Sequence, residues 1–442
     1  MATSLRGRRE FLRAAAAATV GSPLAPYLGN AWAQQPAPPK SANDRPRIAV
    51  IGMRYQGAVI AEKAKAHGDL VAFCDVDRHV REMAKACFGS TQKIYEDYRQ
   101  MLDDKGIDVV LIGSPDHWHA KMAIDAMRAG KDVYVEKPLT LTVDEGKAIR
   151  KVAEVTQRVV QVGTWQRSDI NFRLAAELVR AGRLGTVRKV VAVAGPNPTG
   201  GPFAAAPVPG NLNWNLWLGQ APKVDYVPER CHYTFRWWWD YAGGKMTDWG
   251  AHHLDIIQWA LGEQRTGPIA VEGTGTFADV KGGYQVPTKF SAKLTYASGV
   301  EVEARDAGEN GIRFEGDKGW LFVERGKIKG TVIDELKENP LPREKFTLYA
   351  HDTKNAVDRT EKLGSLVSHM ENFFACVRSR NRATISDPES QHRSATVCHL
   401  ANIAVRLGRK LKWDPATEQF VGDAEAGGML ARVQRKGFEV TS

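Results

Sequence analysis

The chain has 442 residues, which is enough for two domains that each bury a core of their own. Hydrophobic residues make up 43% of the chain and charged residues 25%, the composition of an ordinary globular protein. The net charge is +10, but lysine and arginine form no dense run, so the composition favours a mildly basic, solvated surface over nucleic-acid binding.

The first 33 residues have the pattern of an export signal. An arginine pair at residues 8–9 precedes an alanine-rich run over residues 14–20, and Ala-Trp-Ala at residues 31–33 matches a cleavage site. This pattern is typical of a twin-arginine signal for the Tat export machinery, so we expect a periplasmic protein. The alternative is an arm without an export role. No stretch of the sequence is apolar for long enough to predict a membrane span.

The five cysteines are widely spaced, odd in number and without a Cys-x-x-Cys pair. Although export would place them in an oxidising compartment, this spacing predicts small buried side chains rather than a disulfide framework or a metal site. They are Cys74, Cys87, Cys231, Cys376 and Cys398.

After a proline-rich linker over residues 34–46, the chain has the layout of a dinucleotide-binding unit. A strand over residues 48–51 ends at Gly52, a helical pattern follows Gly57, and a second strand over residues 70–74 ends at Asp75. Gly52 permits a tight turn, and Gly57 lets the helix pack closely on the strand. An acid at position 75 binds a ribose 2′-hydroxyl and repels a 2′-phosphate, so we expect NAD rather than NADP.

Arg54 departs from the usual Gly-x-Gly-x-x-Gly pattern, because it stands where the second glycine belongs. Its guanidinium can bind the pyrophosphate instead. Gln56 is a further candidate cofactor contact in the same turn.

Helices and buried strands continue to alternate up to residue 163, which predicts a doubly wound parallel sheet over residues 47–163. Ligands bind at the carboxyl ends of such strands, and two polar segments follow strands there: residues 114–119 and residues 136–138. The candidate cofactor contacts in the first segment are Ser114, Pro115, His117 and His119. The predicted elements are strands over 107–113, 131–135 and 159–163, and helices over 94–103, 120–130 and 143–155.

Residues 164–365 predict an α+β domain for substrate binding or oligomerisation, with a large, mostly antiparallel open sheet. Residues 195–228 form a long loop rich in proline and glycine, and long loops are usually functional. Two helices over residues 366–412 are expected to return to the first domain, and residues 413–442 read as a tail. The predicted strands cover 188–194, 269–278, 290–296, 300–305, 312–316 and 319–324.

A dense cluster of Trp, Asp and His runs from residue 235 to residue 255. Asp248 and His252 are four residues apart, so on a helix they share one face, as a carboxylate and a general base do. The alternatives are a helix cap with packed histidines, and a metal site that includes His253 and Asp255. Adjacent histidines point about 100° apart on a helix, so we expect no metal.

The aromatic and polar residues of this cluster suit a sugar, whose ring face stacks on indoles while its hydroxyls accept hydrogen bonds. Three consecutive tryptophans cannot all face one way, so at least one belongs to a core. Gln166 is a further candidate cofactor contact. The candidate substrate contacts are Arg167, Arg236, Trp237, Asp240, Trp249 and His253.

Four features together resemble the Gfo/Idh/MocA family of oxidoreductases over residues 47–412. They are the glycine turn, Pro-x-x-Trp-His at 115–119, Glu-Lys-Pro at 136–138 and Asp-x-Gly-x-His at 248–252. The resemblance implies that Lys137 lies beside the nicotinamide and the reacting carbon, completed by Asp248 and His252. It also implies that Glu136 and His119 help to hold the cofactor, and that the open sheet serves a homo-oligomer.

These features predict an oxidoreductase that moves a hydride between a hydroxyl carbon of a sugar or cyclitol and NAD. Because an exported enzyme meets no free pool of the cofactor, we expect NAD to be tightly bound and recycled within the site. One alternative is an NAD-dependent glycosidase that oxidises its substrate, eliminates the aglycone and reduces the product. Another is a sugar-binding protein without catalysis.

Overall fold

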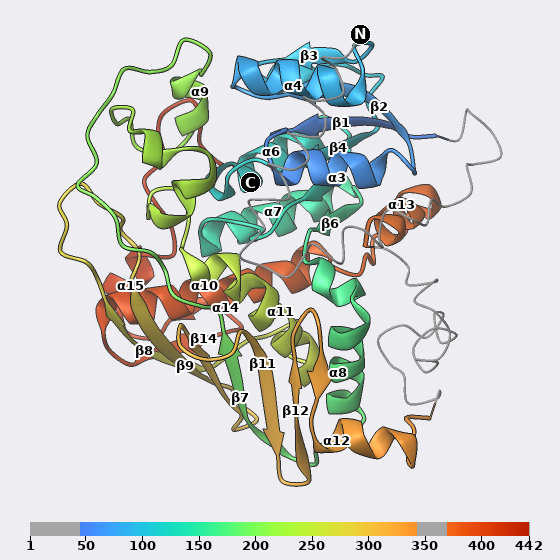
Figure 1. Ribbon diagram of the computed structural model, residues 1–442, viewed down its shortest axis with the longest axis vertical. Coiled ribbons are helices and arrows are strands. Elements are labelled where there is room, and N and C mark those ends of the chain that lie inside the picture. The colour runs from blue at the N-terminus through green and yellow to red at the C-terminus, as the bar shows by residue number, and fades with distance from the viewer. Residues whose placement is uncertain (1–44, 343–368, 442) are drawn as a thin grey trace.

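The computed structural model describes residues 45–342 and 369–441 and contains two sheets, one in each half of the molecule (Figure 1). The export signal predicted over residues 1–33, most of the predicted linker, and residues 343–368, which include the end of the predicted α+β domain, lie outside the described residues. Within the described ranges, no helix combines the length and the apolar character needed to cross a bilayer.

The first sheet is parallel and six-stranded, in the order β3-β2-β1-β4-β5-β6, which confirms the predicted doubly wound fold. Strands β4 and β5 are buried along their whole length, because helices cover both faces of the sheet. The strand order reverses between β1 and β4, and this switch point is where ligands bind in such sheets. The strands are β1 (Arg47–Ile51), β2 (Asp69–Cys74), β3 (Lys93–Tyr95), β4 (Val109–Ile112), β5 (Asp132–Val135) and β6 (Val160–Val162). The helices are α3 (Gln56–Ala64), α4 (Arg78–Phe88), α5 (Tyr98–Leu102), α6 (Asp116–Arg128) and α7 (Val143–Thr156).

The helix predicted over residues 94–103 is shorter than expected. Lys93–Tyr95 instead forms an edge strand that pairs in parallel with β2. The helix α5 begins only after Asp97, whose side chain accepts a hydrogen bond from the backbone N–H of Arg99 and so caps the helix.

The second sheet has nine strands in the order β13-β12-β11-β7-β10-β9-β8-β14-β15. Only the β7–β10 pairing is parallel among those described, so the sheet is mostly antiparallel, as predicted. Its strands are β7 (Val187–Val193), β8 (Ala270–Thr276), β9 (Lys289–Thr295), β10 (Glu301–Arg305), β11 (Gly311–Gly316), β12 (Gly319–Val323), β13 (Ile328–Lys329), β14 (Leu411–Asp414) and β15 (Gln419–Phe420).

One face of this sheet packs on helices, and their side chains join the strands in a single apolar core. Helix α11 is buried at every residue except its last, so it is covered all round although it carries the polar residues His252, His253, Asp255 and Gln258. The α-helices of this half are α8 (Ile170–Arg180), α9 (Trp214–Leu218), α10 (Lys245–Asp248), α11 (Gly250–Leu261), α12 (Thr331–Asp334), α13 (His369–Ser379), α14 (Pro388–Leu407) and α15 (Ala424–Gly428). The short 3-10 helices are η2 (Trp165–Ser168), η3 (Pro228–Arg230), η4 (His232–Trp237) and η5 (Glu335–Lys337).

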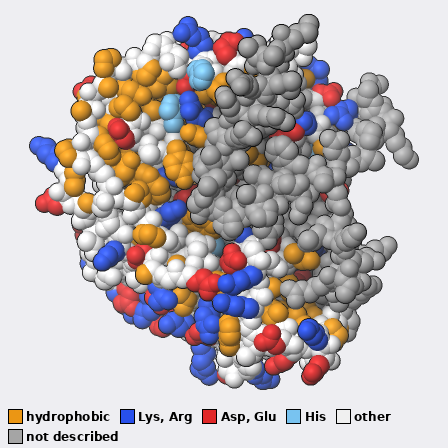
Figure 2. Space-filling view, viewed as in Figure 1, with side chains coloured by type: hydrophobic (Ala, Val, Ile, Leu, Met, Phe, Trp, Pro, Cys, Tyr) orange, Lys and Arg blue, Asp and Glu red, His pale blue; other side chains and the backbone are white. Residues whose placement is uncertain are grey.

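The other face of the sheet carries charges of both signs. Lys293 on β9 lies 2.8 Å from Glu272 and 3.3 Å from Glu301, one on each neighbouring strand. Lys and Arg side chains are also interspersed with Asp and Glu over the lower part of the surface (Figure 2), where β11 and β12 lie in Figure 1. A homo-oligomer through this face stays a prediction.

Two segments near the C-terminus pack on different halves of the molecule. Helix α13 returns to the parallel sheet, where Phe373 and Phe374 pack in a core with Ile48. The residues after 412, read above as a tail, contribute instead to the second sheet, because β14 pairs with β8 and Trp413 is buried in the core.

Candidate active site

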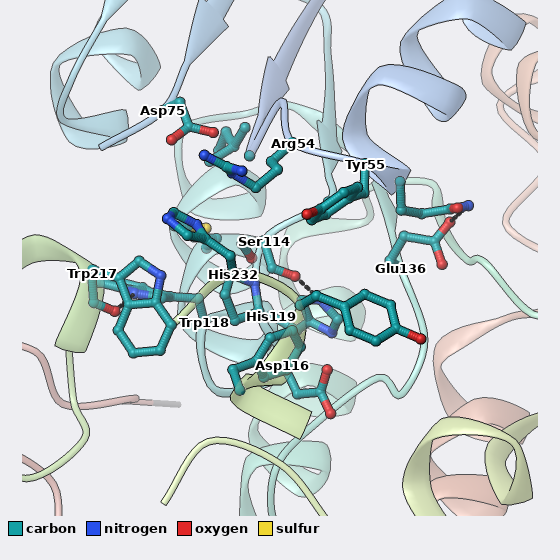
Figure 3. Close-up of a pocket in the computed structure, with 18 of the residues that line it drawn as sticks. Arg54, Tyr55, Asp75, Ser114, Asp116, Trp118, His119, Glu136, Trp217 and His232 are labelled. Carbon is teal, nitrogen blue, oxygen red and sulfur yellow. Dashed lines mark hydrogen bonds between the residues drawn. The ribbon is translucent and has the colours of Figure 1, made fainter. Parts of the chain in front are cut away.

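A pocket opens at the carboxyl ends of β1, β2, β4 and β5, and the second domain closes its other side (Figure 3). Arg54 and Asp75 lie together at one end of it, and Glu136 lies apart from them. Of the residues predicted for the site, those that line the pocket are Gly52, Arg54, Gln56, Asp75, Ser114, Pro115, His119, Glu136, Lys137, Arg236, Asp248, Trp249 and His252.

Lys137 and Asp248 form an ion pair that joins the two domains. The Lys137 ammonium, just after β5, donates to Asp248 Oδ1 at 2.7 Å and to the Asp248 carbonyl at 3.1 Å. Burial by itself would raise the pKa of Asp248, but Lys137, Arg236 and Lys245 together hold that pKa well below its usual range. Asp248 is therefore a fixed anion at neutral pH.

His252 lies in the same pocket, but it does not pair with Asp248 as the i, i+4 spacing predicts. The Asp248 carboxylate turns to Lys137 instead, and His252 Nδ1 has no hydrogen-bond partner among the described residues. Burial lowers the pKa of His252 well below its usual range, and the positive charges of Lys137 and Arg325 lower it further. His252 is thus a neutral imidazole in this structure, and the same shift makes it a weaker base than an exposed histidine.

The glycines of the turn let backbone segments pack closely beside the pocket. Gly52 has φ +77°, and a Cβ there would lie 2.7 Å from the Ser114 backbone nitrogen. Gly57 does not line the pocket; a Cβ on it would lie 1.6 Å from the Gly52 carbonyl oxygen, so it allows α3 to start against β1. The Ser114 hydroxyl is buried without a partner, which suits a bound polar group.

The far end of the pocket is acidic. Asp75 accepts hydrogen bonds from the backbone N–H groups of Met53 and Asp77, both at 2.9 Å, and burial raises its pKa to about 6. Arg54 Nη2 pairs with Asp77 at 3.1 Å, while Arg54 Nε has no partner among the described residues, so a contact of Arg54 with a pyrophosphate stays a prediction. Glu96 and Asp97 line the same end. The carboxylates at this end suit the hydroxyl groups of a ribose.

The opposite wall is built on Glu136 and His119. Glu136 is 5% exposed and accepts a hydrogen bond from Gln56 at 2.9 Å, while burial raises its pKa. The ring nitrogens of His119 lie 2.6 Å from the Pro138 carbonyl and 2.9 Å from the Ser114 carbonyl, so this histidine ties the two predicted polar segments together. The Ser114 hydroxyl, which has no partner among the described residues, and the carboxylates around Asp75 fit a dinucleotide.

Several predicted contacts lie outside the pocket lining. Arg167 is 2% exposed and donates two hydrogen bonds to Asp255, at 2.6 and 2.8 Å, so it is a buried structural group rather than a sugar contact. His253 lies 3.3 Å from the Asn310 side chain. The others are His117, which contacts the Trp217 carbonyl; Gln166, which is fully buried; Trp237, which is buried; and Asp240, which pairs with Arg230.

The three consecutive tryptophans do not form a sugar platform. Trp238 belongs to the core of the lobe that the long loop builds, and Arg406 and Arg432 stack on Trp239 at 3.7 and 4.1 Å. Trp249 lines the pocket, together with Trp165 from η2.

Sequence reasoning missed several residues of the pocket, among them Arg325, Asp116 and Tyr233. The Arg325 guanidinium lies 4.5 Å from the Trp165 ring centre and 4.3 Å from that of Trp249, and burial lowers its pKa to about 10. Arg325 follows β12, 77 residues beyond Asp248, so no local pattern marks it. Asp116 belongs to the predicted polar segment over residues 114–119. Its position directly after β4 could have marked it as a pocket residue. Tyr233 belongs to η4.

Family models match most of the chain. One described as "Oxidoreductase family, NAD-binding Rossmann fold" matches residues 46–164, and one described as "Oxidoreductase family, C-terminal alpha/beta domain" matches residues 201–440.

Curated relatives match over a shorter span. The chain is 35% identical over 175 residues to the alpha-N-acetylgalactosaminidase of Shewanella oneidensis, an alignment that covers 34% of this chain and 38% of that protein. It is 33% identical over 174 residues to a glycosyl hydrolase family 109 protein of Shewanella baltica, with the same two coverages. The chain therefore spans little more than a third of the length of these relatives.

Solved structures share the fold over nearly their whole length. The aldose-aldose oxidoreductase from Caulobacter crescentus has a TM-score of 0.60 and 20% identity, covering 83% of this chain and 99% of that one. The WlbA dehydrogenase from Bordetella pertussis, in complex with NADH and UDP-GlcNAcA, has a TM-score of 0.60 and 17% identity, covering 84% and 99%.

Proposed function

Because the chain belongs to the Gfo/Idh/MocA oxidoreductase family, we propose that it transfers a hydride between a hydroxyl-bearing carbon of a sugar or cyclitol and NAD. The observation that carries this proposal is the Lys137–Asp248 ion pair, which lies with the neutral His252 in the same pocket as the dinucleotide-binding turn. Alcohol oxidation requires a site for the nucleotide, a charge that stabilises the developing alkoxide and a group that accepts the hydroxyl proton.

Residues at the strand ends of the first domain would hold the cofactor. Gly52 and Ser114 would approach the pyrophosphate, Asp75 the adenosine ribose and Glu136 the region nearer the reacting centre. When bound, the nicotinamide supplies a hydride acceptor and donor. The acidic residues around Asp75 support NAD over NADP, since a 2′-phosphate would meet Asp77 and Glu96 as well.

The chain's own groups would handle the hydroxyl proton. His252 accepts it as a neutral imidazole, and the Lys137 ammonium stabilises the negative charge that develops on the oxygen. Asp248 fixes the position of the ammonium through a 2.7 Å hydrogen bond. Arg325 and Trp249 would contact the remainder of the sugar from the second domain.

We also propose that NAD is held tightly, which the long loop supports. Asn211 donates to Asp77 Oδ1 and Asn213 to Glu96 Oε1, both at 2.6 Å, so the loop is fastened across the acidic end of the pocket. Leu212 and Trp217 of the same loop line the pocket. Tight retention agrees with export through the Tat route and residence in the periplasm, which the predicted signal over residues 1–33 supports.

A second candidate is an NAD-dependent glycosidase, favoured by the 35% identity to the Shewanella oneidensis alpha-N-acetylgalactosaminidase. Two assays on one preparation separate the candidates. Sugars and cyclitols are screened for the near-ultraviolet absorbance of reduced nicotinamide, and aryl glycosides are incubated without added cofactor. Reduced nicotinamide or an oxidised sugar supports the first candidate, and release of the aglycone supports the second. A protein that binds sugars and does neither is without catalysis, which would refute the proposal.

A further inference from the structure

An aromatic contact joins the two domains across the pocket. Tyr55, in the nucleotide-binding turn, and Tyr233, on η4, both line the pocket, and their ring centres lie 6.2 Å apart in an edge-to-face arrangement. Tyr55 lies between Arg54 and Glu136 in Figure 3, and so between the acidic end and the opposite wall. Tyr233 is 37% exposed, so the contact lies on the side of the pocket that faces solvent.

The Tyr233 side of the contact is fixed to the reacting end of the site. The Arg236 guanidinium stacks on the Tyr233 ring, 4.5 Å from its centre, and Arg236 Nη1 donates to the Tyr233 carbonyl at 2.8 Å. Arg236 Nε lies 3.8 Å from the Asp248 carboxylate. The position of the Tyr233 ring is therefore tied to the ion pair of Lys137 and Asp248.

The Tyr55 side of the contact is fixed to the acidic end. The Arg54 guanidinium lies 5.8 Å from the centre of the Tyr55 ring, and it pairs with Asp77 at 3.1 Å. His232 of η4 lies 4.0 Å from the same Asp77. A chain of side-chain contacts thus runs from Asp248 to Asp77 along the solvent side of the pocket.

The backbone on both sides of the contact is strained. Tyr55 has φ +50° and His232 has φ +56°, a region that residues with a Cβ rarely adopt. Tyr55 also precedes α3 without a side-chain hydrogen bond that caps the helix. Non-glycine residues persist in this region only where surrounding contacts hold them, and they cluster at ligand clamps and switches. Opening the contact would relieve this strain, which favours a contact that opens and closes over a permanent one.

We propose that the Tyr55–Tyr233 contact is a gate for the nucleotide, which enters and leaves the pocket only when the two rings separate. This inference rests on the NAD-dependent function proposed above and adds to it the step that limits cofactor exchange. An edge-to-face aromatic pair is more favourable than its buried area alone implies, so the closed position is the stable one. A gate slows entry and exit alike, whereas a residue that merely binds the cofactor slows mainly its exit.

The test measures release and affinity together. Protein loaded with NADH is mixed with excess NAD, and the loss of bound-NADH fluorescence gives the release rate; equilibrium titration with NADH gives the dissociation constant. Tyr55→Ala and Tyr233→Ala should each release NADH about 3- to 10-fold faster. Their dissociation constants should stay at the wild-type value, because entry accelerates as much as exit. The double variant should be no faster than the faster single variant, since either change removes the same contact.

Two kinds of control accompany these variants. Tyr55→Phe and Tyr233→Phe keep the edge-to-face rings and should release NADH at the wild-type rate. Phe277→Ala is the matched control, because Phe277 is also 37% exposed and lies beside an arginine, Arg406, but is outside the pocket lining. It should change neither quantity. Wild-type release from both alanine variants, or a dissociation constant that rises in proportion to the release rate, would overturn the gate.

Failure of the gate and failure of the proposed function have different signatures. If the wild type binds NADH and both alanine variants release it at the wild-type rate, the gate is refuted and the NAD-dependent function stands. If the wild type binds neither NAD nor NADH, the proposed function fails and the gate fails with it.

Discussion

Lys137 reaches from the end of β5 to Asp248 on α10, so a single side chain couples the nucleotide-binding domain to the substrate side of the pocket. Lys137→Ala should lower kcat by about 100- to 1,000-fold, because it removes the cation that stabilises the developing alkoxide. The measurement is steady-state turnover on whichever sugar the screen identifies. Lys105→Ala, at an exposed position, is the control. Unchanged turnover in Lys137→Ala would contradict the mechanism.

Asp248 also contributes to stability, in a way that depends on pH. Its pKa in the folded protein is far below the unfolded value of about 4, so its contribution is present above about pH 4 and is lost as the pH falls below that. Asp248→Asn leaves Lys137 without its counter-ion and should cost about 2 kcal/mol at pH 7. In urea unfolding, the difference in unfolding free energy between wild type and Asp248→Asn should shrink below about pH 4. A difference that stays constant with pH would show that the ionised Asp248 carboxylate is not the source of this stability.

At the residue scale, most of the site residues predicted from the sequence line the pocket, but the sequence does not predict their pairings. Asp248 and His252 have helical spacing, yet a cation from another domain competes for the carboxylate, and no local pattern encodes that competitor. Arg167 shows the opposite failure: it follows β6 toward the site in sequence, but its guanidinium donates to Asp255, 88 residues away, and to Ile385 and Ser390. Burial by distant elements decides both cases.

At the scale of elements, no local sequence pattern predicts the structure of the long loop over residues 195–228. It forms a lobe with its own aromatic core and is fastened to the nucleotide-binding domain by Asn211 and Asn213. The double variant Asn211→Ala/Asn213→Ala should therefore release bound nucleotide faster than the wild type. The measurement is the decay in fluorescence of bound reduced nicotinamide after dilution into excess NAD. Asn339→Ala, at an exposed position, is the control. Equal release rates would show that the loop does not retain the cofactor.

The predictable elements are those with a strong local signal. The parallel strands are continuous apolar runs because both of their faces are covered, and the later strands alternate because one face is solvated. Strands β3 and β14 escape prediction because each is short and is held mainly by its neighbour, β2 and β8 respectively. Pairing with a distant strand leaves no mark in the strand's own sequence.

At the scale of the whole molecule, the site exists only where the two domains meet. The first domain supplies the nucleotide turn, Glu136 and Lys137, and the second supplies Asp248, His252 and Arg325. Neither half holds both a cofactor site and the residues that would act on a substrate. The central claim is therefore that a hydride crosses this interface from a sugar carbon to the nicotinamide.

The most direct measurement of that claim follows an isotope. The purified protein is incubated with NAD and a substrate sugar carrying deuterium on its hydroxyl-bearing carbons, and the nucleotide is then analysed by mass spectrometry. The account predicts reduced nicotinamide that contains one deuterium in the wild type and a severe loss of that product in Lys137→Ala. Reduced nicotinamide without deuterium, or an equal yield from Lys137→Ala, would contradict it.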